Sequence, residues 1–160
     1  MKYVLFSGIS SPLSNMHPAP MLLWGKQFHS SEQAYMFAKA AMFNDTEIEN
    51  AILKADSPYE AKKLGRMVKD FDYRRWDHHK DKIMHDILIE KFLQNKDLQD
   101  HLMSYHMDSL YVECAPWDKY WGNGISIEES RKIEPNKWPG KNKLGHILKA
   151  IRMHIHLSIS

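Results

Sequence analysis

The sequence has one cysteine, no long hydrophobic run and almost no excess of either charge. A single cysteine, Cys114, excludes an intramolecular disulfide and favours a reducing compartment. No stretch reaches the roughly 18 apolar residues of a membrane helix, and the first residues lack a signal-peptide pattern. The net charge of +2 is too small to indicate a protein that coats nucleic acid. We therefore expect a cytoplasmic protein that does not bind a membrane.

Two common kinds of binding motif are also missing. No glycine-rich loop follows a predicted strand, which argues against a Rossmann or P-loop nucleotide site. The chain has 10 histidines, but none lies in an HExxH pattern and none is accompanied by a cysteine pair. We expect neither a metal ion nor a cofactor.

The hydrophobic pattern predicts few strands and many helices. At this length we expect a single domain over residues 1–160. Short apolar segments bounded by turn residues predict strands at 3–6 and 110–114. They also predict a hairpin with strands at 21–24 and 27–28. The fold class expected is α+β, mostly α-helical, with a few short strands.

Capping residues predict where several helices begin. Ser30 with Gln33, and Ser57 with Glu60, form capping boxes. Helical periodicity then extends the first helix to about Phe43 and predicts helices at about 74–95 and 98–103. Two further helices are expected. One begins at Pro58 and ends near Gly65, and the last one is capped by Asn142.

The first predicted helix carries two faces. One is small and apolar, suited to close helix packing. The other face places Glu32 and Lys39 in line, seven residues apart. Met36 lies between them on this face, and Phe43 follows Lys39. Two turns separate the charged pair by roughly 10 Å, too far for an unstrained salt bridge but enough for a sugar ring. Either this stripe lines a pocket, or the two charges are unrelated surface groups. The packing face consists of Ala34, Phe37, Ala38 and Ala41.

Two turn-rich segments, 117–124 and 138–145, combine tryptophan, glycine and an acid. Tryptophan is costly to leave on a loop unless its ring packs or stacks on something. Glycine allows a ligand to approach the backbone closely. A flat aromatic wall, the carboxylate of Asp118 and a bare backbone would suit a nucleotide-like ligand. Trp121 beside Gly122 is the best candidate for stacking on a base.

Many short motifs occur in the order typical of one family. The motifs are Ser-Pro-Leu-Ser-Asn at 11–15, Ser-Glu-Gln-Ala-Tyr at 31–35, Ala-Lys-Ala at 38–40, Gly-Arg at 65–66, Trp76, Lys-Phe at 91–92, Asp118, Trp-Gly at 121–122, Gly-Lys-Asn at 140–142 and Leu-Gly at 144–145. With these motifs the chain resembles the NADAR or YbiA-like proteins from about Phe6 to Arg152. One departure is Met16, where the family usually has an aromatic residue.

The resemblance implies a compact, mainly helical N-glycosidase. Such proteins act on N-glycosidic bonds of NAD- and ADP-ribose-related or ribosylamine compounds. The substrate would be a ribosylaminopyrimidine of riboflavin synthesis or ADP-ribosylated guanine, and nucleic acid would be a partner only as a modified substrate. A binding protein that sequesters ADP-ribose- or NAD-derived nucleotides without turnover is the alternative. The family's catalytic positions map onto Glu32, Lys39, Trp76 and Asp118.

Two mechanisms fit these residues. Cleavage of a ribose–nitrogen bond builds positive charge at C1′, which a carboxylate such as Glu32 or Asp118 stabilises while an acid protonates the leaving amine. Alternatively, a ribosylamine opens to an imine and Lys39 exchanges with it to form a Schiff base. The apolar neighbours of Lys39 would lower its pKa, as this second route requires.

The remaining candidates would bind the substrate. Ser14 and Asn15 either contact ribose hydroxyls or only close a turn. Arg66 either holds a phosphate or makes a surface ion pair. Lys141 and Asn142, at the start of the last helix, are candidate phosphate ligands because a helix N-terminus favours anions.

Overall fold

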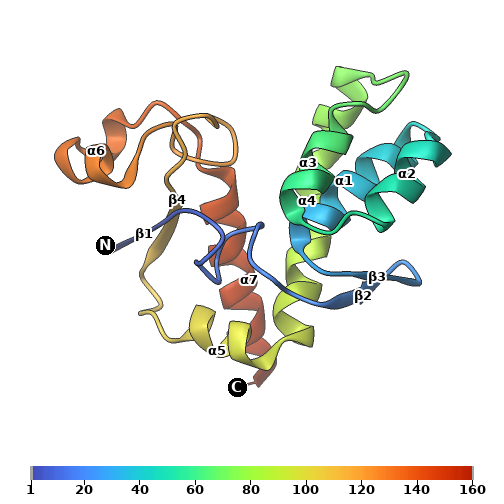
Figure 1. Ribbon diagram of the computed structural model, residues 1–160. Coiled ribbons are helices and arrows are strands. Elements are labelled where there is room, and N and C mark those ends of the chain that lie inside the picture. Colours follow the sequence, from blue (N-terminus) through green and yellow to red (C-terminus); the bar gives the residue numbers. More distant parts are fainter. Residues whose placement is uncertain (1, 160) are drawn as a thin grey trace. The chain divides into compact units, whose positions relative to one another are not determined.

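The computed structural model describes residues 2–159, and its elements are mostly helices with a few short strands, as the sequence predicts (Figure 1). The contacts between residues divide the chain into two compact units. We call residues 15–99 the central unit and residues 2–14 with 100–159 the terminal unit. None of the helices described between residues 2 and 159 is long and apolar enough to cross a membrane.

The central unit contains one hairpin and a cluster of helices. Strands β2 (Met21–Leu23) and β3 (Lys26–Phe28) pair antiparallel, with Met21 opposite Phe28. The turn lies one residue earlier than the sequence suggests, at Trp24 and Gly25, where both φ angles are positive. Helix α1 (Ser31–Met42) packs against α2 (Thr46–Leu53), α3 (Pro58–Gly65) and α4 (Tyr73–Gln94).

Helix α1 (Ser31–Met42) begins where its capping residues predict. The Ser30 hydroxyl accepts a hydrogen bond from the backbone N–H of Gln33. The Gln33 side chain reaches one residue further back than in a standard capping box and accepts from the N–H of His29 at 2.8 Å. These contacts fix the first turn of α1, which carries Glu32.

No sequence pattern predicts α2, and one carboxylate explains its position. Asp45 caps α2 by accepting from the N–H of Ile48, and its other oxygen accepts from the N–H of Lys69 at 2.8 Å. The hydrogen bond from Lys69 is the largest of the effects that lower the pKa of Asp45. The second contact comes from 24 residues away, so no local pattern could reveal it.

We expect Asp45→Asn to destabilise the protein in a pH-dependent way. Because the folded state lowers the pKa of Asp45 below 3.8, its stabilising effect is complete above that pH and disappears as the pH falls through the folded value. The difference in melting temperature between wild type and variant should be larger at pH 7 than in strong acid. Asp56→Asn, at an exposed carboxylate, is the control; equal differences for Asp45→Asn at both pH values would contradict the expectation.

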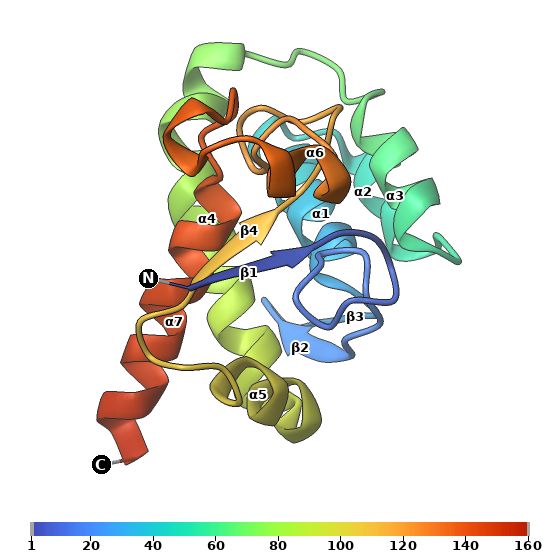
Figure 2. The same cartoon turned by 90° about the vertical axis from the view of Figure 1, so that its left-hand side faces the viewer.

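The terminal unit is built on two parallel strands. Strand β1 (Tyr3–Phe6) pairs with β4 (Leu110–Glu113) (Figure 2). In this register Tyr3 lies opposite Leu110. Helix α7 (Lys143–Ile159) packs against β4. The sequence analysis missed two short elements of this unit, α6 (Ile127–Lys132) and the 3-10 helix η1 (Pro135–Lys137), whereas α5 (Lys96–Met103), which leads into the unit, was predicted.

Gly145 allows α7 to lie directly on β4. A Cβ atom at this position would collide with the carbonyl oxygen of Tyr111 and the side chain of Asn142. We therefore expect Gly145→Ala to lower the free energy of unfolding by about 3 kcal/mol or more, measured by urea denaturation.

The control for this prediction is Gly8→Ala in the same unit. Gly8 has open space around it but a φ of +85°. Alanine there should lower the free energy of unfolding only by the backbone strain of that φ, about 1 kcal/mol. If Gly145→Ala were no more destabilising than Gly8→Ala, the close approach of α7 to β4 would be wrong.

Candidate active site

The stripe of α1 that bears Glu32 and Lys39 is a second buried face. Glu32 and Met36 are each 8% exposed and Phe43 is 9% exposed, while Lys39 is half-buried. The end of α3 covers the middle of this stripe, because Met36 packs so closely on Gly65 that a Cβ atom there would collide with the Met36 sulfur. Burial rules out the reading of Glu32 as an ordinary surface charge.

Lys39 is the electrostatic centre of this stripe. Its pKa is lowered, mainly because burial removes water from the ammonium group; the Glu32 carboxylate acts in the opposite direction and the Arg66 guanidinium lowers it further. The Lys39 Nζ also lies 4.6 Å from the centre of the Phe71 ring. The direction of the pKa shift agrees with the sequence prediction, and the charges of Glu32 and Arg66 both act on Lys39.

Arg66 caps the C-terminal end of α3 and is exposed. Its side chain makes no ion pair with any residue in the described part of the chain. The sequence left two roles open for Arg66, a phosphate contact and a surface ion pair. Among the described residues the ion pair is absent. The guanidinium remains able to bind an anion such as a phosphate.

Trp76 lies in the first turns of α4 and is only 6% exposed. Its ring packs at a tilt against Tyr35, with centroids 5.1 Å apart. Tyr35 belongs to α1, one turn after Glu32, so Trp76 contacts the helix that carries the proposed acid and lysine.

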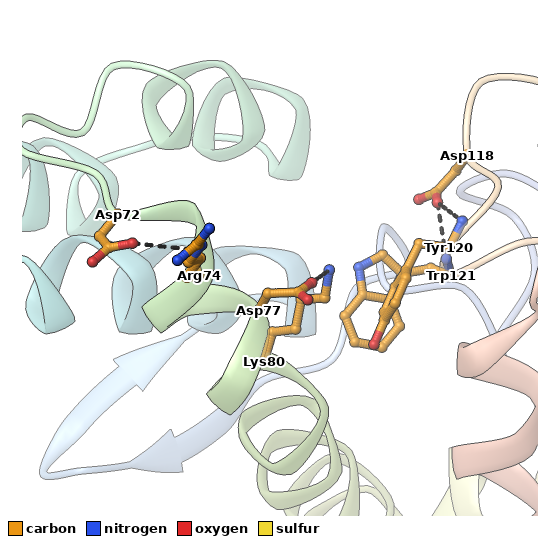
Figure 3. Close-up of polar contacts among 7 residues, drawn as sticks. All are labelled: Asp72, Arg74, Asp77, Lys80, Asp118, Tyr120 and Trp121. Atoms are coloured by element: carbon orange, nitrogen blue, oxygen red, sulfur yellow. Dashed lines mark hydrogen bonds and ion pairs between the residues drawn. The ribbon is translucent and has the colours of Figure 1, made fainter.

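Lys80 is a candidate that the sequence analysis missed. It is 7% exposed, forms an ion pair with Asp77 (Figure 3), and places its Nζ 5.8 Å from the ring centre of Tyr73. The available signal was its spacing, since Lys80 follows Trp76 by four residues and so shares its face of α4.

Asn15 fixes the start of α1. Its side-chain oxygen accepts from the Ser31 hydroxyl at 3.0 Å, and its carbonyl accepts from the N–H of Glu32 at 3.0 Å. Its amide nitrogen contacts the sulfur of Met84 at 3.5 Å. Asn15 therefore positions Glu32 through the backbone. Ser14, in the terminal unit, is 3% exposed and its N–H closes a turn onto Ser11.

In the terminal unit, Asp118 is held by one oxygen only. Its Oδ1 accepts from the backbone N–H groups of Tyr120 and Trp121, both at 2.9 Å (Figure 3). Its Oδ2 makes no hydrogen bond or ion pair with any residue between 2 and 159. This arrangement orients the carboxylate and leaves one oxygen for another group.

The tryptophan and glycine of this loop have different roles. Trp121 is half-buried, with its ring edge-on to Tyr120 at 4.9 Å between centroids. Gly122 is buried, and a Cβ atom there would crowd the Glu113 carbonyl and Ala115. The glycine thus serves close packing of the protein's own backbone, a role that the sequence interpretation did not include.

The expected anion site at the start of α7 is also corrected. The backbone N–H groups of residues 140–144 each donate to a carbonyl of the 119–123 loop, so they are not available to a phosphate. Lys141 is exposed, and its Nζ lies 5.5 Å from the ring centre of Tyr120.

Asn142 does not cap α7 through its side chain. Its Oδ1 accepts from the N–H of Glu113 and its Nδ2 donates to the carbonyl of Tyr111. The side chain therefore ties the loop to β4, which is 29 and 31 residues away along the chain. This contact occupies the amide that the sequence analysis assigned to the substrate.

The candidates thus form one group in each unit. Glu32, Lys39 and Arg66 interact in the central unit, beside Trp76. Asp118, Trp121, Gly122, Lys141 and Asn142 belong to interlinked loops of the terminal unit. Over residues 2–159, no cluster of three or more histidine, cysteine, aspartate or glutamate side chains could hold a metal ion.

Comparisons with known proteins bear on the family and the fold of the chain. The NADAR domain model matches residues 2–156. The chain is 36% identical to N-glycosidase R617 of Acanthamoeba polyphaga mimivirus, over 94% of this chain and 95% of that protein. It is 29% identical to the riboflavin biosynthesis protein VVA0006 of Vibrio vulnificus, over 88% of this chain but 34% of that protein. The NMR structure of the E. coli protein YbiA is similar at 25% identity, with a TM-score of 0.80 over 99% of this chain and 87% of that one, which confirms the predicted fold class.

Proposed function

The chain belongs to the NADAR domain family, and from this we propose that it is an N-glycosidase that hydrolyses the bond between a ribose carbon and a nucleobase-like amine. The observation that carries the proposal is the buried α1 stripe, in which Lys39 has a lowered pKa and interacts with Glu32 and Arg66. A general acid or base and a lysine with a lowered pKa, both on one helix, provide the groups that this reaction needs.

In the acid/base route, Glu32 assists the departure of the amine and activates water. Cleavage leaves positive charge at C1′ of the ribose, and a carboxylate nearby stabilises that charge. The family resemblance makes Asp118 the second proposed carboxylate, and its Oδ2 makes no hydrogen bond or ion pair with the described residues. Lys39 then provides electrostatic support.

In the covalent route, Lys39 is the nucleophile. A ribosylamine opens to an imine at C1′, the neutral Lys39 amine adds to this carbon, and the base amine leaves with a proton from Glu32. Water hydrolyses the resulting Lys39 imine, which releases the ribose aldehyde and restores the lysine. The lowered pKa of Lys39 favours this route because only the neutral amine can attack.

The proposed substrate carries at least one phosphate. Arg66 presents a guanidinium without an ion-pair partner among the described residues, close enough to Lys39 to lower its pKa. The candidates are a ribosylaminopyrimidine phosphate, as in riboflavin synthesis, and ADP-ribose attached to guanine, free or in nucleic acid. Trp121 is proposed to stack on the base, and Trp76 to support the sugar.

Incubation with three substrates side by side tests this function. Ribosylaminopyrimidine phosphate, ADP-ribosylguanine DNA and NAD are each mixed with the protein, and the released ribose species are identified by mass. We expect turnover of at least one. Tight binding without any product would favour a sequestering protein instead, and neither binding nor product would contradict the proposal.

A further inference from the structure

The central unit has an open apolar groove between α1 and α4 on the side of α1 opposite Glu32 and Lys39. Its volume is about 620 Å³, within the range of about 300–1,000 Å³ typical of small-molecule sites. Ala38 and Ala41, which the sequence predicts to lie in a tight contact between helices, are only half-buried. Both line this groove. We call it the α1–α4 groove; it is lined by Trp24, Phe37, Ala38, Ala41, Met42, Arg75, His79, Lys82, Ile83 and Asp86.

An unusual tryptophan forms one wall of the groove. Trp24 has a φ of 53° in the turn between β2 and β3, a conformation that a bulky L-residue adopts only at a cost. Its ring stacks on Phe37, with centroids 6.2 Å apart and planes 25° apart, yet 47% of the residue is exposed. The hairpin thus holds the Trp24 ring at the wall of the groove while leaving much of it exposed to solvent. Such a ring is suited to stacking on the flat ring of a ligand.

The charges at the rim point to an anion. Lys82 is paired with Asp86 at 2.8 Å, so these two largely cancel. Arg75 is exposed and makes no ion pair with any residue of the described chain; its guanidinium lies 5.7 Å from the ring centre of Phe43. A guanidinium at the edge of an apolar groove is well suited to a carboxylate, sulfonate or phosphate.

We propose that the α1–α4 groove binds a planar aromatic anion, with its ring stacked by Trp24 and its acidic group held by Arg75. The apolar floor formed by Ala38, Ala41 and Ile83 excludes water from the ring, and the helix backbones keep the walls in place. Glu32, Lys39 and the rest of the α1 stripe do not line this groove, and Arg75 touches the stripe only at the Phe43 ring. The proposal does not depend on the glycosidase proposal.

Two fluorescent probes with the same ring system test the site. Anilinonaphthalene sulfonate is an aromatic anion, and phenylnaphthylamine is its uncharged counterpart. Both should bind the folded protein saturably at one site. Arg75→Gln should weaken binding of the anion about tenfold and leave the uncharged probe nearly unchanged. Ala41→Phe, which fills the groove, should weaken both probes at least about tenfold, and Ala38→Phe gives a second filling variant.

The control for Arg75 is its neighbour Arg74, an exposed arginine that does not line the groove. Equal losses for Arg74→Gln and Arg75→Gln would overturn the proposal, as would probe binding that both filling variants leave intact. Circular dichroism checks that each variant is folded. If wild type is a dimer in sedimentation and Ala41→Phe makes it monomeric, the groove is an interface between copies and the proposal is wrong. Glu32→Gln should bind both probes like wild type, so a failed glycosidase assay would leave this test unaffected.

Discussion

Glu32→Gln should lower kcat by about 10²–10⁴-fold, the usual contribution of a positioned general acid or base. The amide is almost the same size as the carboxylate, so the packing of this residue, which is 8% exposed, should change little. It cannot transfer a proton or stabilise positive charge at C1′ as a carboxylate does. Initial rates on whichever substrate is turned over, with the dissociation constant measured separately, check this result.

A second glutamate provides the matched control for this prediction. Glu47 lies in the first turn of α2 with its side chain 83% exposed, and among residues 2–159 its only ion pair is a long one of 3.9 Å to Lys69. Glu47→Gln should leave kcat unchanged. If Glu32→Gln retained full activity, or lost activity only because its melting temperature fell, Glu32 would not be the proton-transfer group.

The sequence predicts those features of this fold that depend on neighbouring residues. Ser30 and Ser57 both cap the helices that they were expected to begin, because a capping hydroxyl binds an N–H only three residues away. The stripe of Glu32, Met36 and Lys39 was visible for the same reason, since helical spacing alone puts these residues on one face.

Features that depend on distant parts of the chain were missed or misread. Asn142 looks like a helix cap, but its amide binds β4 about 30 residues earlier. The carboxylate of Asp45 joins the start of α2 to Lys69. Likewise, the interaction of Arg66 with Lys39 joins α3 to α1, and nothing in the spacing of these two residues predicts it.

Lys39→Arg should separate the two mechanisms. Arginine keeps the positive charge but is not a nucleophile at neutral pH. If Lys39 forms a Schiff base, the substitution should lower kcat on the order of 10³-fold or more, and borohydride added with substrate should attach a ribose adduct to Lys39 of the wild type. If Lys39 only supports charge, Lys39→Arg should keep activity within roughly tenfold and no adduct should form. Lys63→Arg, at an exposed position on α3, is the control.

The pH dependence of this trapping gives the covalent route a second, independent test. Only the neutral amine reacts, so the trapping rate should rise with pH as Lys39 loses its proton. Because the Arg66 guanidinium lowers the pKa of Lys39, Arg66→Gln should raise that pKa and move the rise to higher pH. The Glu32 carboxylate has the opposite effect, so Glu32→Gln should move it to lower pH. Trapping that responds to neither substitution would place the adduct on another lysine, because both charges act on Lys39.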